Sequence, residues 1–194
     1  TIKAINEGHK IIFIKGACGT GKSAIALNLA KELGRTSIVV PSKPLQKQYE
    51  DDYTNRLHIL KDNGEKLKIS VIDGRNNHKC IFKEDSMADD KFLPCDIEIK
   101  EANKELIKNY IEENPFVKIE DFESIKDVRR KSIAPACPYW SPIICKDWFE
   151  NGYVLEDAKE LEYKGLRNKT FTYHKRKDGC KYYEQFIGYV NSDV

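Results

Sequence analysis

The sequence predicts an α/β fold in which a parallel sheet core carries an inserted, mainly helical subdomain rich in cysteine. Three observations lead to this prediction. Residues 1–79 alternate short apolar runs with helical patterns, as in a parallel sheet with right-handed crossovers. A glycine-rich loop joins the first predicted strand to the first predicted helix. Five of the six cysteines lie between residues 80 and 180, where this alternation stops.

Each element of the first part follows from its own local pattern. The strands are short apolar or β-branched runs, as expected of strands buried on both faces. The first helix shows apolar residues at helical spacing and ends at Gly34, while the second has Pro44 in its first turn. The predicted strands are 10–15, 36–40 and 68–72, and the predicted helices are 23–33 and 44–53.

The second part lacks that rhythm. Two polar helices are expected at 102–113 and 119–130, followed by a segment at 132–149 dense in proline, cysteine and aromatic residues. The predicted domains are therefore a motor core at 1–79, a cysteine-bearing insertion at 80–180, and a return into the core at 181–194. The last residues look like the beginning of a further strand, so we expect a fragment of a longer protein.

Composition excludes several classes of protein. The 194 residues suffice for one domain, or for a core with an insertion. The 33 basic and 31 acidic residues give a net charge of +2, which excludes a uniformly basic nucleic-acid coat and an acidic disordered tail. The longest apolar run, 11–14, is far shorter than the ~20 residues of a membrane span. We expect no membrane contact, and a reducing, cytoplasmic location for the thiols.

The glycine-rich loop GACGTGKS, at 16–23, predicts a nucleoside triphosphate site. It matches GxxxxGK[ST] between a strand and a helix, the context that this motif requires. Its backbone N–H groups can surround a β-phosphate, and the helix beginning at Ser23 adds its positive end. Lys22 would neutralise the β- and γ-phosphates, and the Ser23 hydroxyl would bind Mg²⁺. The predicted nucleotide-binding residues are Gly16, Gly19, Thr20, Gly21, Lys22 and Ser23, and the last two are also assigned to catalysis.

A second acidic site for hydrolysis is missing from the sequence. Asp73, after the third predicted strand, is the one candidate for a strand-terminal Mg²⁺ ligand, and no glutamate stands beside it. In-line attack by water needs such an acidic ligand and a water-orienting group. We therefore expect residues 1–194 alone not to turn over ATP.

Three segments together resemble the iron–sulfur superfamily 2 helicases of the XPD/DinG type. They are GACGTGKS, VPSKPLQKQY at 40–49 and DGRNNHKC at 73–80. The resemblance implies a P-loop NTPase (RecA-like) core and an ATP-dependent helicase acting on nucleic acid, with DNA favoured. It also implies nucleic-acid contacts at Ser42, Gln48 and Arg75, and a second motor domain beyond Val194.

The cysteines of the insertion suit a metal centre. By residue type, four thiolates fit a [4Fe–4S] cluster or a zinc ion, but the paired C-x₂₋₄-C knuckles typical of structural zinc are absent. With the helicase resemblance, the favoured ligands are Cys80, Cys95, Cys137 and Cys180, in an insertion that would separate the duplex. Cys145, near Trp148, has the neighbours of a buried free thiol and is the substitute ligand.

Two other functions remain open from sequence. One is a small P-loop nucleotide kinase with a metal-stapled lid, which the chain length suits. The other is a regulatory module that binds nucleotide without catalysis. The basic run at 174–177 (HKRK) is likewise open, as a solvated charge run or as a guide for a single strand.

Overall fold

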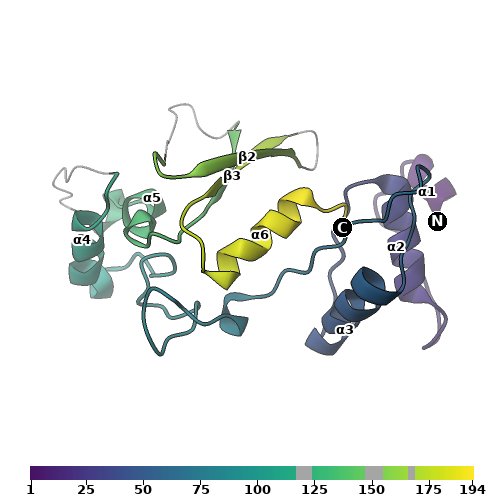
Figure 1. The fold of residues 1–194 in the computed structure, drawn as a ribbon, viewed down its shortest axis with the longest axis horizontal. Helices are drawn as coiled ribbons and strands as arrows, with labels where there is room; N and C mark the ends of the chain where they lie inside the picture. The colour runs from purple at the N-terminus through teal and green to yellow at the C-terminus, as the bar shows by residue number, and fades with distance from the viewer. Residues whose placement is uncertain (117–123, 147–154, 166–168) are drawn as a thin grey trace. The chain divides into compact units, whose positions relative to one another are not determined.

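The computed structural model describes residues 1–116, 124–146, 155–165 and 169–194 (Figure 1). The chain divides into two compact units, one formed by residues 1–71 and 191–194 and the other by residues 72–190. Within the described residues, no helix is long and apolar enough to cross a bilayer. The domain limits expected after residues 79 and 180 stay a prediction.

The first unit contains α1 (Ile2–Asn6), α2 (Lys22–Leu33) and α3 (Lys43–Gln48), the last continuing as a π-helical segment, η1 (Tyr49–Arg56). The helix predicted at 23–33 is confirmed by α2, which ends at Gly34 in a positive-φ conformation of 77°. The helix predicted at 44–53 is confirmed by α3 and the beginning of η1.

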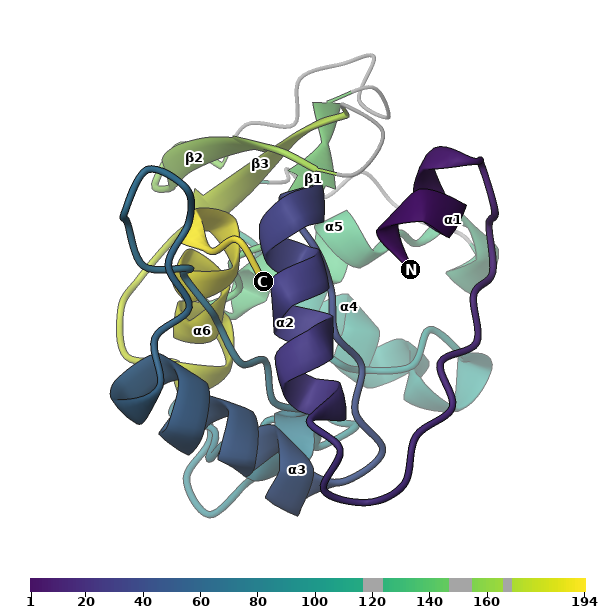
Figure 2. The same ribbon diagram turned by 90° about the vertical axis from the view of Figure 1, so that its right-hand side faces the viewer.

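A small hydrophobic core joins these helices. Leu27 of α2 is fully buried, and Tyr49 and Leu67 are nearly so. Partly buried apolar residues pack around these three, among them Leu45 of α3. Figure 2 shows α3 beside α2, in keeping with this shared core. Burial of these apolar faces fixes the helix that follows the glycine-rich loop.

The three parallel strands predicted in this unit are not found in the described residues. Segments 10–15, 36–40 and 68–72 carry no strand assignment, and the Phe13 side chain is 94% exposed. A strand requires a neighbour along its length to complete the ladder. The C-terminal residues provide the beginning of such a neighbour, because Val194 donates to Lys68 O (3.1 Å) and accepts from Ser70 N (2.8 Å). This alternation is the bonding pattern of parallel strands.

The second unit combines short helices with a three-stranded antiparallel sheet. Its elements are η2 (Arg75–Asn77), η3 (Glu101–Asn103), α4 (Lys104–Glu112), η4 (Ile125–Asp127), α5 (Arg130–Ile133), η5 (Ala134–Ala136), β1 (Ile143–Cys145), β2 (Lys159–Lys164), β3 (Thr170–Lys175) and α6 (Lys181–Asn191). The helix predicted at 102–113 is confirmed by η3 and α4. The helix predicted at 119–130 begins outside the described residues, and its described end holds η4 and the first residue of α5.

The sheet is the main departure from the expected helical insertion. Its strand order is β1-β3-β2, and Leu161 of β2 lies opposite Tyr173 of β3. Threonine and aromatic residues dominate TFTYHK at 170–175, a composition that favours a pleated, half-buried strand. Helix α6 packs against the sheet, since Tyr173 donates to Tyr183 O (2.8 Å) and the Tyr163 and Tyr189 rings meet edge to face.

A second hydrophobic core holds α4 and α5 together. Its buried members are Ile97, Ile107, Ile111, Val128 and Ile133. Cys95 lies two residues before Ile97, and Cys137 lies four residues after Ile133. This core therefore supports two of the loops that carry cysteines.

Candidate functional site

The glycine-rich loop of the first unit has the backbone of a phosphate site. Gly19 and Gly21 adopt positive φ angles of 78° and 75°, which a residue with a side chain rarely does. A Cβ at Gly16 would lie 2.8 Å from Thr20 Oγ1. The loop therefore needs glycine at these positions in order to turn tightly into α2, whose N-terminus follows at Lys22.

Lys22 lies over this loop. Its ammonium donates to Ala17 O (2.5 Å) and Gly16 O (3.2 Å), while the Thr20 hydroxyl donates to Ala17 O (2.8 Å). The charge is thus held at the mouth of the loop, where a phosphate oxygen could replace the two carbonyls as its partner. Ser23 occupies the second position of α2, next to Lys22.

Two of the residues expected to contact nucleic acid lie at the ends of α3. Ser42 is the N-cap residue, Gln48 is the last helical residue, and both are exposed. Leu45 between them turns into the core of this unit. The helix thus leaves both polar side chains accessible to a ligand, and their assignment to nucleic acid stays a prediction.

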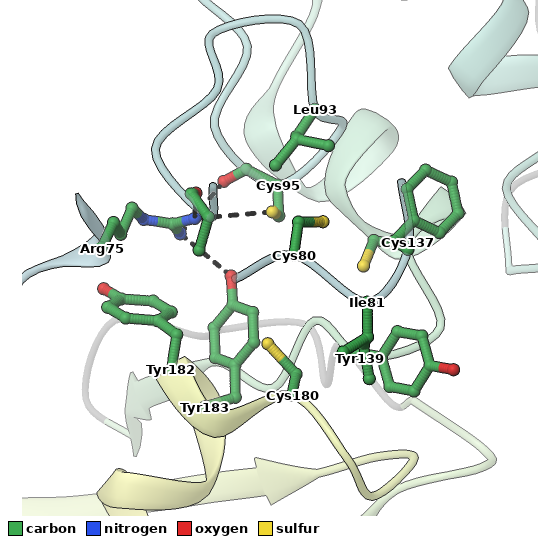
Figure 3. A pocket seen from close by; sticks show the side chains of 12 residues that line it. Arg75, Cys80, Ile81, Leu93, Cys95, Cys137, Tyr139, Cys180, Tyr182 and Tyr183 are labelled. Carbon is green, nitrogen blue, oxygen red and sulfur yellow. Dashed lines mark hydrogen bonds between the residues drawn. The ribbon is translucent and has the colours of Figure 1, made fainter. Parts of the chain in front are cut away.

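The second unit contains a pocket that brings four cysteines together. Figure 3 shows the sulfur atoms of these cysteines turned toward a common space. The lining residues are Arg75, Cys80, Ile81, Phe82, Ala88, Leu93, Cys95, Cys137, Tyr139, Cys180, Tyr182 and Tyr183. These four cysteines are the ones expected as metal ligands. Cys145 is not among the lining residues: it is buried in β1, opposite Phe171.

Four separate segments supply these thiols. Cys80 follows η2, and its N–H donates to Ser86 O (2.8 Å). Cys95 stands in a turn closed by hydrogen bonds from Asp96 and Ile97 to Leu93 O. Cys137 follows η5. Cys180 directly precedes α6, and its carbonyl oxygen accepts hydrogen bonds from the first-turn N–H groups of that helix. No two of the thiols share a local motif, so only the tertiary fold brings them together.

Arg75 lies inside this pocket. Its guanidinium donates to Cys95 Sγ (3.4 Å), Cys95 O (3.3 Å) and Tyr183 OH (3.0 Å), and it stacks 4.4 Å above the Tyr182 ring (Figure 3). Its side chain is 20% exposed. The structure thus occupies Arg75 with a cysteine and two tyrosines, and its assignment to nucleic acid stays a prediction.

These contacts set the charge state of the thiols. A hydrogen bond from the Cys137 thiol, followed by the Arg75 guanidinium, lowers the pKa of Cys95 to about 6 against the opposing effect of burial. The same sulfur–sulfur hydrogen bond and burial raise the pKa of Cys137. Burial also raises the pKa of Cys180. The pocket therefore favours one thiolate, on Cys95, with Cys137 as its proton donor.

The four thiols of the pocket can be compared with two kinds of metal centre. In the part of the chain that the structure describes, no group of three or more His, Cys, Asp or Glu side chains could hold a metal ion as it stands. A mononuclear zinc site needs four ligands about 2.3 Å from one point. A four-iron cluster is larger and takes its thiolates from around a wider space. By residue type the four thiols that line this pocket suit either group, and the iron–sulfur assignment stays a prediction.

Two of the four residues of the basic run at 174–177 are buried. The Arg176 side chain is 2% exposed and the His174 side chain 7% exposed. Lys175 pairs with Asp178, and Lys177 lies over the Tyr139 ring. A solvated charge run therefore does not describe His174 and Arg176, while guidance of a single strand by the exposed Lys177 stays a prediction. Thr172, Tyr173 and His174 are buried in succession along β3, so no alternating pattern in the sequence could have shown the burial of His174.

Comparison with known proteins gives one family. The model of the family described as type III restriction enzyme, res subunit, matches residues 1–119. The match covers the glycine-rich loop, helix α3, and the first two pocket cysteines, Cys80 and Cys95. No curated protein and no solved structure matches the chain.

Proposed function

The chain belongs to the family of the type III restriction enzyme res subunit, the N-terminal region of superfamily 2 helicase and restriction motors, and on this premise we propose that it is an ATP-dependent DNA helicase of the iron–sulfur type. The family is one of ATP-hydrolysing motors with a RecA-like P-loop domain. The observation that carries the finer assignment is the pocket in which Cys80, Cys95, Cys137 and Cys180 meet.

The glycine-rich loop would bind ATP with Mg²⁺. The positive-φ glycines turn backbone N–H groups toward the β-phosphate, and the N-terminus of α2 adds its positive end. Lys22 would exchange its bonds to Gly16 O and Ala17 O for the β- and γ-phosphates, and Ser23 would offer its hydroxyl to Mg²⁺.

The four cysteines would hold a [4Fe–4S] cluster. Such a group, when bound, supplies covalent cross-links between four loops that share no local motif. Arg75 would donate to the Cys95 thiolate, and the two tyrosines beside it would keep water from that side of the pocket. The result would be a rigid insertion suited to separating the strands of a duplex.

Nucleic acid would contact the first unit at the exposed ends of α3, Ser42 and Gln48. We also propose a second motor domain beyond Val194, because the ATP hydrolysis cycle of such motors opens and closes the cleft between two RecA-like domains. Neither a nucleotide kinase nor a non-catalytic regulatory module gains support from the family match or from the pocket.

Anaerobic purification of the chain tests this proposal. The protein should be brown, absorb broadly near ~400 nm and contain about four irons and four sulfides per chain. ATP binding by the same preparation should require Mg²⁺. Zinc without iron, or neither metal in a folded chain, would refute the iron–sulfur assignment while leaving the family and its phosphate loop intact.

A further inference from the structure

Arg176 is the most deeply buried charged side chain whose contacts the structure describes, with only 2% of it exposed. Burying a guanidinium is costly unless its donors are satisfied. Nε donates to both carboxylate oxygens of Asp157, at 2.8 and 3.0 Å, and Nη1 donates to Pro135 O (3.1 Å) and Cys137 O (2.8 Å). Its backbone N–H donates to Ser141 Oγ (3.0 Å).

These bonds join two of the cysteine-bearing segments. Arg176 directly follows β3, and Cys180 stands four residues further on, at the beginning of α6. Cys137 comes from the loop after η5, 39 residues before Arg176 in the chain. Beside backbone hydrogen bonds such as that from Lys177 N to Pro138 O (3.3 Å), this side chain ties the carbonyl of Cys137 itself to the strand that leads to Cys180.

We infer that Arg176 is a positioning residue for the metal centre, holding Cys137 at the distance from Cys180 that joint ligation of one cluster requires. The inference rests on the proposed cluster. Arg176 itself does not line the pocket. It acts through the carbonyl of Cys137.

Arginine is suited to this role and lysine is not. The planar guanidinium presents five donors in a fixed fork, so it can bond a carboxylate on one edge and two carbonyls on another. A lysine ammonium is a single point charge with three donors, so it cannot reach both the carboxylate and the two carbonyls. Outer partners that orient metal ligands typically contribute 10–100-fold to metal affinity.

The loop of Cys95 is held in a similar way. Arg130 donates to Pro94 O (3.4 Å) and Ile97 O (2.6 Å), the carbonyls on either side of the cysteine turn. Two of the four candidate ligands therefore stand in irregular loops whose carbonyls are bonded to arginine side chains, the buried Arg176 and the partly buried Arg130. These arginine donors add to the backbone hydrogen bonds that close the two turns.

The test compares Arg176→Lys with Arg129→Lys in the whole chain. Arg129 also donates to two backbone carbonyls, those of Lys126 and Val128, but these flank no cysteine. After reconstitution with iron and sulfide, Arg176→Lys should lose iron to a chelator ~10-fold faster than wild type and show a shifted reduction potential. Arg129→Lys should match wild type in both. Wild-type loss rate and potential in Arg176→Lys would overturn the inference.

Alkylation of the iron-free, reduced chain separates positioning from general unfolding. In Arg176→Lys, Cys137 should react faster while Cys145, buried in β1, stays protected. Equal exposure of both thiols would mean that Arg176 only supports the fold, and would overturn the inference. Asp157→Asn, which loosens the same guanidinium, should give a smaller change in the same direction, and no change in either variant would also overturn it.

These readouts distinguish the inference from the proposed function. Wild-type protein that takes up no iron refutes the cluster, and the alkylation of Cys137 then decides whether Arg176 positions that loop. Wild-type protein that takes up iron, with an Arg176→Lys variant that behaves identically, refutes only the role of Arg176.

Discussion

The guanidinium of Arg75 bonds both the sulfur and the carbonyl oxygen of Cys95, at 3.4 and 3.3 Å. One side chain thereby fixes the position of a candidate ligand and stabilises its thiolate. Arg75 stands five residues before Cys80, so the same short segment supplies one thiol and orients another.

Arg75→Gln should raise the pKa of Cys95. The Cys137 thiol is the main cause of the low value of about 6, and Arg75 adds to it, so the variant keeps part of the shift. In the iron-free chain at pH 6 to 8, fewer Cys95 side chains would be thiolates and alkylation would slow. Mass spectrometry of Cys95 alkylation between pH 5 and 9 measures the midpoint. An unchanged midpoint in Arg75→Gln, with Arg129→Gln as control, would contradict this.

Lys22→Ala should abolish ATP binding without unfolding the chain. It removes the cation at the mouth of the phosphate loop, and its side chain is exposed, so little burial is lost. Lys15→Ala, just before the loop, should bind normally. Titration with a fluorescent ATP analogue measures both. Equal binding by wild type and Lys22→Ala would remove the assignment of the phosphate site.

His174 should make the second unit less stable in acid. Burial lowers its pKa below 6.5 although Glu160 Oε1 lies 3.3 Å from Nδ1 and opposes the shift. The folded state therefore binds its proton less readily than the unfolded state. The contribution of neutral His174 to the free energy of unfolding is fully present above about pH 6.5. It is lost as the pH falls through the lower pKa that His174 has in the folded state. Urea unfolding at pH 7.5 and 5.5 should show this loss, and His174→Gln should reduce it; equal losses would count against it.

Ile107→Ala should destabilise the core between α4 and α5. Ile107 is fully buried, and such truncations cost ~2–5 kcal/mol. Ile99→Ala is the matched control, because that side chain is 37% exposed. Hydrogen exchange of the α4 amides reports the difference. Similar exchange rates in the two variants would mean that the cluster around Ile107 contributes little to stability.

The phosphate loop and its helix could be predicted from sequence because their signals are local. Gly16 to Ser23 carries the whole motif, and Gly34 ends the helix. The sheet of the second unit was not predicted, because the pairing of its strands depends on contacts between separate segments and not on a local pattern. Leu161 of β2 and Tyr173 of β3 are one such pair. The predicted strand at 10–15 has the right composition, yet a strand also requires a hydrogen-bonded neighbour.

The cysteine pocket could be predicted only in part. The resemblance selects Cys80, Cys95 and Cys180 by their neighbours, but no sequence pattern states that Cys137 rather than Cys145 joins them. The roles of Arg75 and Arg176 depend on which carbonyls the fold places near them. A charge run such as that at 174–177 looks exposed in sequence, whereas the fold buries two of its members, His174 in β3 and Arg176 just after it.

The iron content of single Cys→Ser variants tests the central claim, a cluster held by Cys80, Cys95, Cys137 and Cys180, most directly. Chains purified anaerobically should lose the absorption near ~400 nm and most of their iron when any one of these four is changed. Cys145→Ser, which changes a buried thiol outside the pocket, should keep about four irons per chain. Iron lost in Cys145→Ser but retained in Cys95→Ser or Cys137→Ser would contradict the ligand set, and iron content unaffected by every one of these changes would contradict the cluster itself.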